Sequence, residues 1–426
     1  MSGLVRRRLR LRRHRGTTAH LGSAYPFQAG SGLGPKGVFL GTDVLAGGAG
    51  FAYDPFELYG DGTLTNPNML FAGEPGVGKS AAAKTFIYRS VGVFGRWVAI
   101  ADPKGEYLPL AEALGLTVVR LHPGGVDRLN PLDHEVAANP TQSDAAAAHR
   151  AATVEALLGS VLRRELAPFE DAAVGWAVGH LARSRVTSPT LADLAAVLGD
   201  PPAELAQQAR LQPAEFAREV SPVTYGLGKL LDRSLRGMFD GPTTVRLDPS
   251  GPGVVLDLSA VHHDREALTL VMIAATAWLQ SVLAAPEGPR RIQVLDEAWC
   301  LLHSERTSRY LQACWKLCRP YGVANVAIVH RLSDLRSQAD DGTAAAKMSM
   351  GLLADTQTRV LFRQSVDQVS DAQALLGLTG TEAQLLSRLC RGRALWKVGG
   401  GHTAVVQHLI GRQERVMCDS DSRMVA

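Results

Sequence analysis

The pattern of hydrophobic and polar positions predicts alternating strands and helices in the first 121 residues. Apolar runs at 67–73, 96–102 and 116–121 are typical of buried strands, and the spacing over 79–91 predicts a helix. A further short strand and turn is expected at 36–44. Alternation of this kind indicates a mostly parallel sheet with helices on its faces, which is an α/β fold.

The middle of the chain has helical periodicity instead. One apolar helix face follows the spacing i, i+3, i+4, i+7 and i+8 through Val154, Leu157, Leu158, Val161 and Leu162. We therefore expect an all-α insertion at 141–235. It would interrupt one α/β domain formed by residues 31–140 and 236–426, and a basic, flexible segment would precede that domain at 1–30.

Strands resume in the last part, at 253–259, 291–299, 323–330 and 358–364, and a hairpin is expected around Gly399–Gly401. Residues 267–285 carry no charge, so they could span a membrane or form a buried crossover helix. Alanines and scattered polar residues dilute this stretch, and an apolar strand follows it directly. We favour the crossover helix and predict no transmembrane helix.

A glycine-rich loop, "GEPGVGKS", joins the strand at 67–73 to the helix at 79–91. Glycines let several backbone N–H groups turn inward around a polyphosphate, and the helix N-terminus adds its dipole. Lys79 would reach the β- and γ-phosphates, and Ser80 would bind Mg²⁺. The expected nucleotide-binding residues are Gly73, Glu74, Pro75, Gly76, Val77, Gly78, Lys79, Ser80 and Ala81.

Two acids, Asp296 and Glu297, end the strand "RIQVL". Asp296 is a candidate Mg²⁺ ligand, and Glu297 is a candidate base for the attacking water. Binding alone needs no such base, so the pair favours hydrolysis. Asp102 and Glu106, in "DPKGEY", either approach the nucleotide or belong to a surface turn.

Two further polar residues flank the strand at 323–330. His330 ends the strand and is either a sensor of the γ-phosphate or a hydrogen-bonded core histidine. Arg319 precedes the strand, where it could reach the nucleotide of a neighbouring subunit in a ring.

Basic charge is concentrated at residues 6–15, which hold seven Arg and no acid. Without them the chain carries 38 basic and 41 acidic residues, a net charge of −3, so bulk charge does not indicate a nucleic-acid binder. The segment from Arg6 to Arg15 could contact anionic lipid, bind nucleic acid or be a solvated tail.

Together these motifs resemble the conjugation and type IV secretion ATPases of the HerA–FtsK superfamily, which are RecA-like P-loop motors. The resemblance covers residues 19–420 and rests on "GEPGVGKS", "DPKGEY", "RLNPLD", "VLDEAWCLL" and "YGVANVAIVHRLSDL". The Trp after the acids looks more like the secretion-energising ATPases than the DNA-coupling proteins. Family members usually carry Gln where His330 stands, which weakens the sensor assignment. The larger members also have a sizeable region upstream of the motor, where this chain has a short basic segment.

The resemblance implies ATP and Mg²⁺ as cofactors, a homo-hexamer, and catalytic roles for Lys79, Glu297, Arg319 and His330. It implies a cytoplasmic motor at the inner face of the plasma membrane that works with a membrane-embedded secretion channel. The cargo stays open between DNA and protein. The alternatives are a DNA translocase or coupling protein, and a nucleotide-dependent scaffold without turnover.

Overall fold

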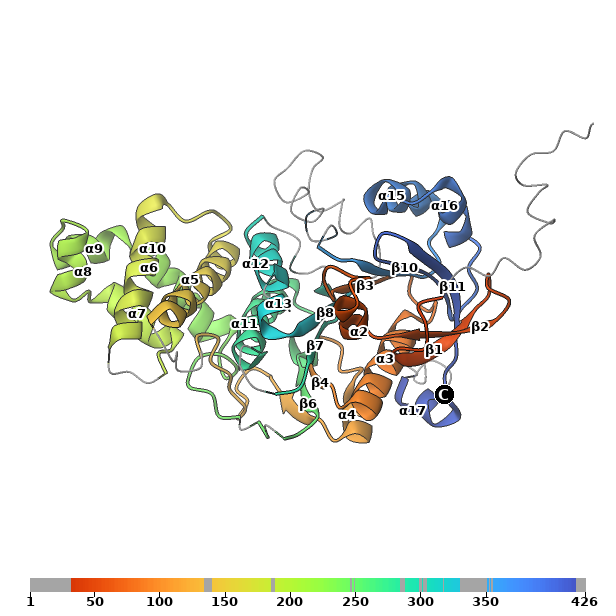
Figure 1. Ribbon diagram of the computed structural model, residues 1–426. Coiled ribbons are helices and arrows are strands. Elements are labelled where there is room, and N and C mark those ends of the chain that lie inside the picture. Colours follow the sequence, from red (N-terminus) through yellow and green to blue (C-terminus); the bar gives the residue numbers. More distant parts are fainter. Residues whose placement is uncertain are drawn as a thin grey trace, which may run out of the picture. The chain divides into compact units, whose positions relative to one another are not determined.

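In the computed structural model, 11 strands of the described residues form one sheet in the order β2-β1-β11-β10-β9-β3-β8-β7-β4-β6-β5 (Figure 1). The structure describes residues 32–133, 140–184, 188–245, 247–248, 250–283, 288–298, 301, 305–316, 318–329, 351, 353 and 355–418. Every described element belongs to one unit, Leu33–Ala426. The basic segment at 1–30 lies outside the described residues.

Seven neighbouring strands run parallel, which confirms the predicted α/β class. They are β9 (Thr358–Leu361), β3 (Met69–Ala72), β8 (Val323–Val329), β7 (Arg291–Leu295), β4 (Trp97–Asp102), β6 (Gly253–Asp257) and β5 (Thr117–Arg120). Alternate side chains of β4 enter two different cores, Val98 and Ile100 on one face and Ala99 and Ala101 on the other. Burial on both faces explains why these strands read as continuous apolar runs.

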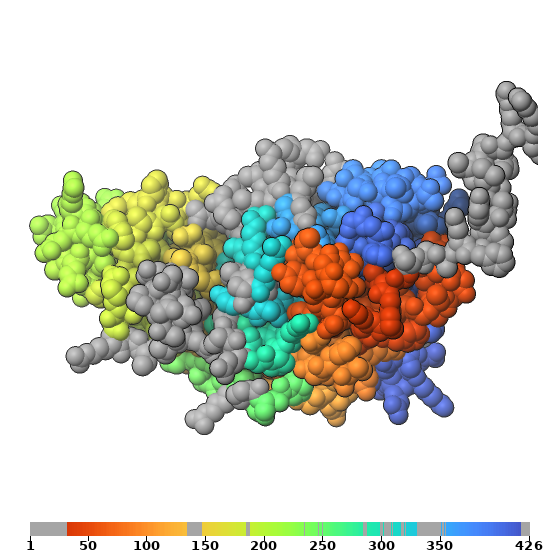
Figure 2. All heavy atoms as spheres, viewed as in Figure 1, coloured from red at the N-terminus to blue at the C-terminus, as the bar shows by residue number. Residues whose placement is uncertain are grey.

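Four antiparallel strands extend the sheet beyond β9. They are β10 (Arg393–Val398), β11 (His402–His408), β1 (Val38–Asp43) and β2 (Ala49–Tyr53). The β10–β11 pair confirms the hairpin predicted at Gly399–Gly401, whereas the sequence pattern missed β2. Because β1 pairs with β11, the last strands (blue) lie against the first ones (red), as Figure 2 shows.

Helices cover both faces of the parallel strands. On one face α3 (Lys79–Phe94) and α4 (Leu108–Leu114) pack against the sheet, and α17 (Arg412–Cys418) contacts both helices. On the other face lie α11 (Arg265–Leu283) and α12 (Glu305–Lys316). The remaining short helices beside the sheet are α2 (Pro55–Gly60), η3 (Ser259–Val261), α13 (Cys318–Tyr321), α15 (Val366–Leu376) and α16 (Gly380–Leu386).

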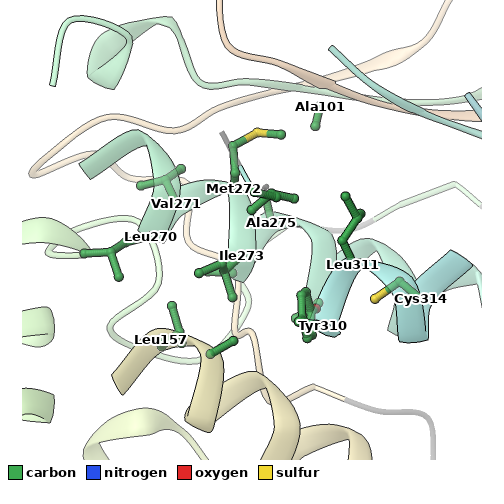
Figure 3. Close-up of a cluster of buried hydrophobic side chains, with 14 of the residues drawn as sticks. Ala101, Leu157, Leu270, Val271, Met272, Ile273, Ala275, Tyr310, Leu311 and Cys314 are labelled. Atoms are coloured by element: carbon green, nitrogen blue, oxygen red, sulfur yellow. The ribbon is translucent and has the colours of Figure 1, made fainter. Parts of the chain in front are cut away.

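The middle of the chain forms a group of helices. They are α5 (Pro140–Leu162), α6 (Pro168–Arg183), α7 (Leu191–Gly199), α8 (Ala203–Gln208), α9 (Pro213–Glu219), α10 (Ser221–Lys229) and the π-helix η2 (Leu230–Ser234). The group packs on α11 and α12 through α5, and η2 also contacts α11. Figure 3 shows Leu157 of α5 facing Leu270 and Ile273 of α11, with Tyr310 of α12 beside them. Whether residues 141–235 constitute a separate domain stays a prediction.

Helix α11 connects the parallel strands β6 and β7 across β4, which confirms the predicted crossover helix. It is long and apolar enough to cross a membrane by length and composition, but 83% of its apolar window is buried inside the protein. Packing between the sheet and α5 therefore accounts for its apolar character.

Candidate nucleotide-binding and hydrolysis site

The glycine loop lies between β3 and α3, at the carboxyl edge of the parallel strands. Gly76 and Gly78 adopt positive φ angles of 77° and 97°, which favour glycine over residues with a Cβ. Gly78 caps α3 without a side-chain hydrogen bond. The first N–H groups of a helix have no acceptor within the helix, so this end of α3 is suited to an anion.

Lys79 is the first residue of α3, and only 3% of it is exposed. Its Nζ donates to the carbonyl of Gly73 at 2.9 Å, so the side chain folds back over the loop. Burial lowers the pKa of Lys79 to about 8, and the charges of Asp296 and Glu297 oppose this effect. A phosphate group would supply the countercharge that a buried ammonium favours. Ser80, the next residue of the same helical turn, is half-buried.

Asp296 and Glu297 directly follow β7, and one strand, β8, separates β7 from β3. Both carboxylates are buried, with exposures of 3% and 2%. Burial and the neighbouring charge of Glu297 raise the pKa of Asp296. Glu297 has a φ of 54°, which is unusual for a residue with a side chain and is common at active sites.

The turn after β4 adds a residue that the sequence analysis did not single out. Lys104 forms an ion pair with Oε1 of Glu297, and 25% of its side chain is exposed. Asp102 and Glu106 both lie near the two acids: the charge of Asp296 acts on Asp102, and that of Glu106 acts on Asp296. Asp102 is fully buried, and its carboxylate accepts the N–H groups of Lys104, Glu106 and Tyr107 at 3.2, 3.1 and 2.8 Å.

A carboxylate oxygen of Glu106 lies 3.9 Å from the buried ammonium of Lys84. The feature of the sequence that could have identified Lys104 is its position. It is a cation two residues beyond a buried strand, and the neighbouring strand β7 ends in the two acids.

The segment before β10 contacts the backbone of the glycine loop. The N–H of Gly392 donates to the carbonyl of Val77 at 2.9 Å. A Cβ on Gly78 would lie 3.2 Å from the nitrogen of Gly392, so this approach needs glycine at position 78. Gly392 itself has a φ of 74°, which favours glycine there. The N–H of Glu74, near the start of the glycine loop, donates to the carbonyl of Arg363 at 3.2 Å. In this conformation that N–H group therefore does not point at a phosphate.

The structure does not bring Arg319 to this edge. Arg319 is exposed in α13, before the first residue of β8, so it lies at the amino edge of the parallel strands. A seven-residue strand separates the two edges by about 20 Å. Arg319 therefore cannot contact the nucleotide of its own subunit. His330 lies outside the described residues.

The donor set fits Mg²⁺ bound together with a nucleotide. Among the described residues, no group of three or more His, Cys, Asp or Glu could hold a metal ion. Mg²⁺ commonly takes one or two protein ligands and completes its shell with phosphates and water. Ser80 and Asp296 are the residues that would supply such a minimal set.

A glycine loop between a parallel strand and a helix, with two acids at the end of the next strand but one, defines a RecA-like P-loop NTPase fold. Solved structures agree with this class. VirB4 of Thermoanaerobacter pseudethanolicus superimposes with a TM-score of 0.70 at 21% identity, over 90% of this chain and 99% of that chain. The bacterial conjugative coupling protein TrwB gives a TM-score of 0.57 at 17% identity, over 81% and 85% of the two chains.

TrwB in complex with ADP and Mg²⁺ gives a TM-score of 0.56 at 18% identity, over 81% of this chain and 86% of that chain. No protein-family model matches the chain, and no curated protein matches its sequence. The chain thus shares the fold of VirB4 and TrwB, as its motifs predict.

Proposed function

We propose that the chain is an ATP-hydrolysing motor that powers DNA or protein transfer by a conjugation or type IV secretion machine. One observation carries this proposal: buried Lys79, Asp296 and Glu297 meet at the loop edge of the sheet and influence one another electrostatically. A site that only bound nucleotide would need no buried acid in the position of Glu297. The likeness to VirB4 over nearly the whole of both chains supports a secretion motor.

The reaction follows from the residues at this edge. The loop and Lys79 would hold the phosphates, and Glu297 would accept a proton from the water that attacks the γ-phosphorus. The bond from the γ-phosphorus to the bridging oxygen breaks, giving ADP and phosphate. Mg²⁺ at Ser80 and Asp296 would neutralise charge on the phosphates.

The test is steady-state ATP turnover by the full chain. Glu297→Gln should lower turnover about 10²–10⁴-fold, as expected for loss of a positioned base, and Lys79→Ala should abolish nucleotide binding. Glu57→Gln is a matched control, because Glu57 is exposed and pairs with Arg290 away from the site. Turnover of Glu297→Gln at the wild-type rate would refute the assignment. Negligible wild-type turnover with intact nucleotide binding would favour the scaffold.

A DNA-coupling function is the second candidate, because TrwB is a plasmid coupling protein of the same fold. The two candidates differ in their response to DNA. A DNA motor should be stimulated by single- or double-stranded DNA, with a steep loss of stimulation as salt increases. Turnover that does not respond to DNA would favour a motor that moves protein or energises the channel.

We further propose that the motor is a homo-hexamer in the cytoplasm, at the inner face of the plasma membrane, with Arg319 acting on the neighbouring subunit. The position of Arg319 at the opposite sheet edge supports action between subunits. Mixing Arg319→Ala subunits with Lys79→Ala subunits tests it, because a mixed ring would contain complete sites and recover turnover. Failure of the mixture to exceed either variant alone would contradict it. Sedimentation with anionic vesicles, with and without residues 1–15, tests the membrane contact of Arg6 to Arg15.

A further inference from the structure

Lys104 has a contact that the hydrolysis scheme leaves unexplained. Its ammonium pairs with Oε1 of Glu297, the carboxylate proposed to accept the proton from water. An opposite charge stabilises the ionised form of a carboxylate and so makes it a weaker proton acceptor. In this conformation the ion pair opposes the proposed role of Glu297.

The two partners differ in their freedom to move. The backbone of the turn is fixed, because Asp102 accepts the N–H group of Lys104 and those of two later residues. The Lys104 side chain is 25% exposed and has a flexible four-carbon stem. The Glu297 side chain is 2% exposed, on a residue with a φ of 54°. A change at the site would therefore move the ammonium of Lys104 first.

The electrostatics of the site indicate what could move it. Lys104 interacts with the charge of Lys79, and both lysines interact with Asp296 and Glu297. The charge of Glu106 acts on both lysines as well. A triphosphate brings more negative charge than a diphosphate to the same edge, so it competes more strongly with Glu297 for an ammonium.

We propose that Lys104 is a positioning residue that holds Glu297 in an ion pair until a nucleoside triphosphate attracts the ammonium and releases the carboxylate. This inference rests on the proposed function, because it assumes that ATP occupies the glycine loop. The switch makes the base available only when a γ-phosphate is present. A purely structural Lys104, which only neutralises a buried charge, would not distinguish triphosphate from diphosphate.

Equilibrium binding separates these two roles without relying on turnover. The dissociation constants of ADP and of the non-hydrolysable analogue ADPNP, both with Mg²⁺, are measured calorimetrically on the full chain. Lys104→Met should weaken ADPNP binding about 10-fold or more, as expected for loss of one charge-assisted contact, and change ADP binding less than about twofold. Lys104→Arg should restore most of the preference for ADPNP. Lys229→Met is the control, since Lys229 also pairs with a glutamate, Glu266, at 3.5 Å.

Glu297→Gln provides an independent arm that does not depend on the folding of Lys104→Met. Without the carboxylate, no ion pair has to break, so ADPNP should bind several-fold more tightly while ADP binding stays unchanged. Equal effects on both nucleotides, or no effect on their ratio in either variant, would overturn the switch while leaving ATP binding intact. Wild-type protein that binds neither nucleotide would refute the proposed function itself, and the switch with it.

Discussion

Arg89 links the glycine-loop helix α3 to helix α17. Arg89 donates to the two carboxylate oxygens of Glu414 at 2.7 and 2.6 Å, and also to the carbonyls of Phe39 and Leu409. Exposure of the two charged side chains is 17% and 10%. Burial opposes ionisation of Glu414, but the hydrogen bonds from Arg89 and from the N–H of Gly411, together with the charge of Arg89, outweigh it and lower the pKa of Glu414.

Arg89→Met would leave the Glu414 carboxylate with the N–H of Gly411, at 2.6 Å, and two carbonyls without their donor. Removing one partner of a buried pair costs about 3–5 kcal/mol, and the residual exposure places this pair at the lower end. We therefore expect Arg89→Met to lower the free energy of unfolding by about 3 kcal/mol. Glu414→Gln keeps an acceptor and should cost about 1–2 kcal/mol.

Urea unfolding monitored by tryptophan fluorescence measures these changes. Arg163→Met is the matched control, because its pair with Glu266 has a similar distance of 2.6 Å but exposures of 76% and 36%. Such a pair should contribute less than about 1 kcal/mol. A cycle with Arg89→Met and Glu414→Leu should show a coupling of about 2 kcal/mol. Additive effects of the two substitutions, or a loss of unfolding free energy in Arg89→Met as small as that of the control, would refute the claim that the Arg89–Glu414 pair stabilises the protein.

Two other predictions concern the antiparallel strands and the loop. Trp396 donates to Nε2 of His408 at 3.0 Å, and burial, with a smaller effect of Arg89, lowers the pKa of His408 to about 3. Since the unfolded chain takes up this proton below about pH 6.5, the free energy of unfolding should fall by about 2 kcal/mol between pH 6.5 and 5. His408→Gln keeps an acceptor and should remove that slope, and an unchanged slope would contradict it. Gly78→Ala should weaken ADP binding at least about 10-fold, because strain in the left-handed region adds to the approach of Gly392. Gly76→Ala, with a φ of 77° and nothing within 4 Å of its Cβ, should have a smaller effect, and equal losses would contradict the packing argument.

Local patterns were sufficient for the elements that carry the glycine loop and the acids. The loop needs left-handed glycines between a buried strand and a helix, and β7 is a buried strand that ends in two acids, so both features are visible in short windows. The antiparallel extension is different. Gly41 pairs with His408, and such long-range pairing depends on packing rather than on nearby residues.

The turn after β4 shows why part of the site escaped prediction. Its conformation depends on Gly105, with a φ of 67°, and on hydrogen bonds from three N–H groups to Asp102. Hydrophobic periodicity carries no information about these hydrogen bonds. The direction in which the Lys104 side chain leaves the turn could therefore not be inferred from the sequence. The acids that end a strand were predictable, whereas their partner required the geometry of the turn.

The position of Glu297 links these features to the proposed cycle. A buried carboxylate on left-handed backbone is costly in the absence of a countercharge, and the ion pair with Lys104 supplies one. In the proposed cycle, the same contact makes Glu297 a weaker base until triphosphate binds. In the proposed cycle, this ion pair both stabilises the buried carboxylate and controls hydrolysis, and binding of triphosphate would supply the free energy that breaks it.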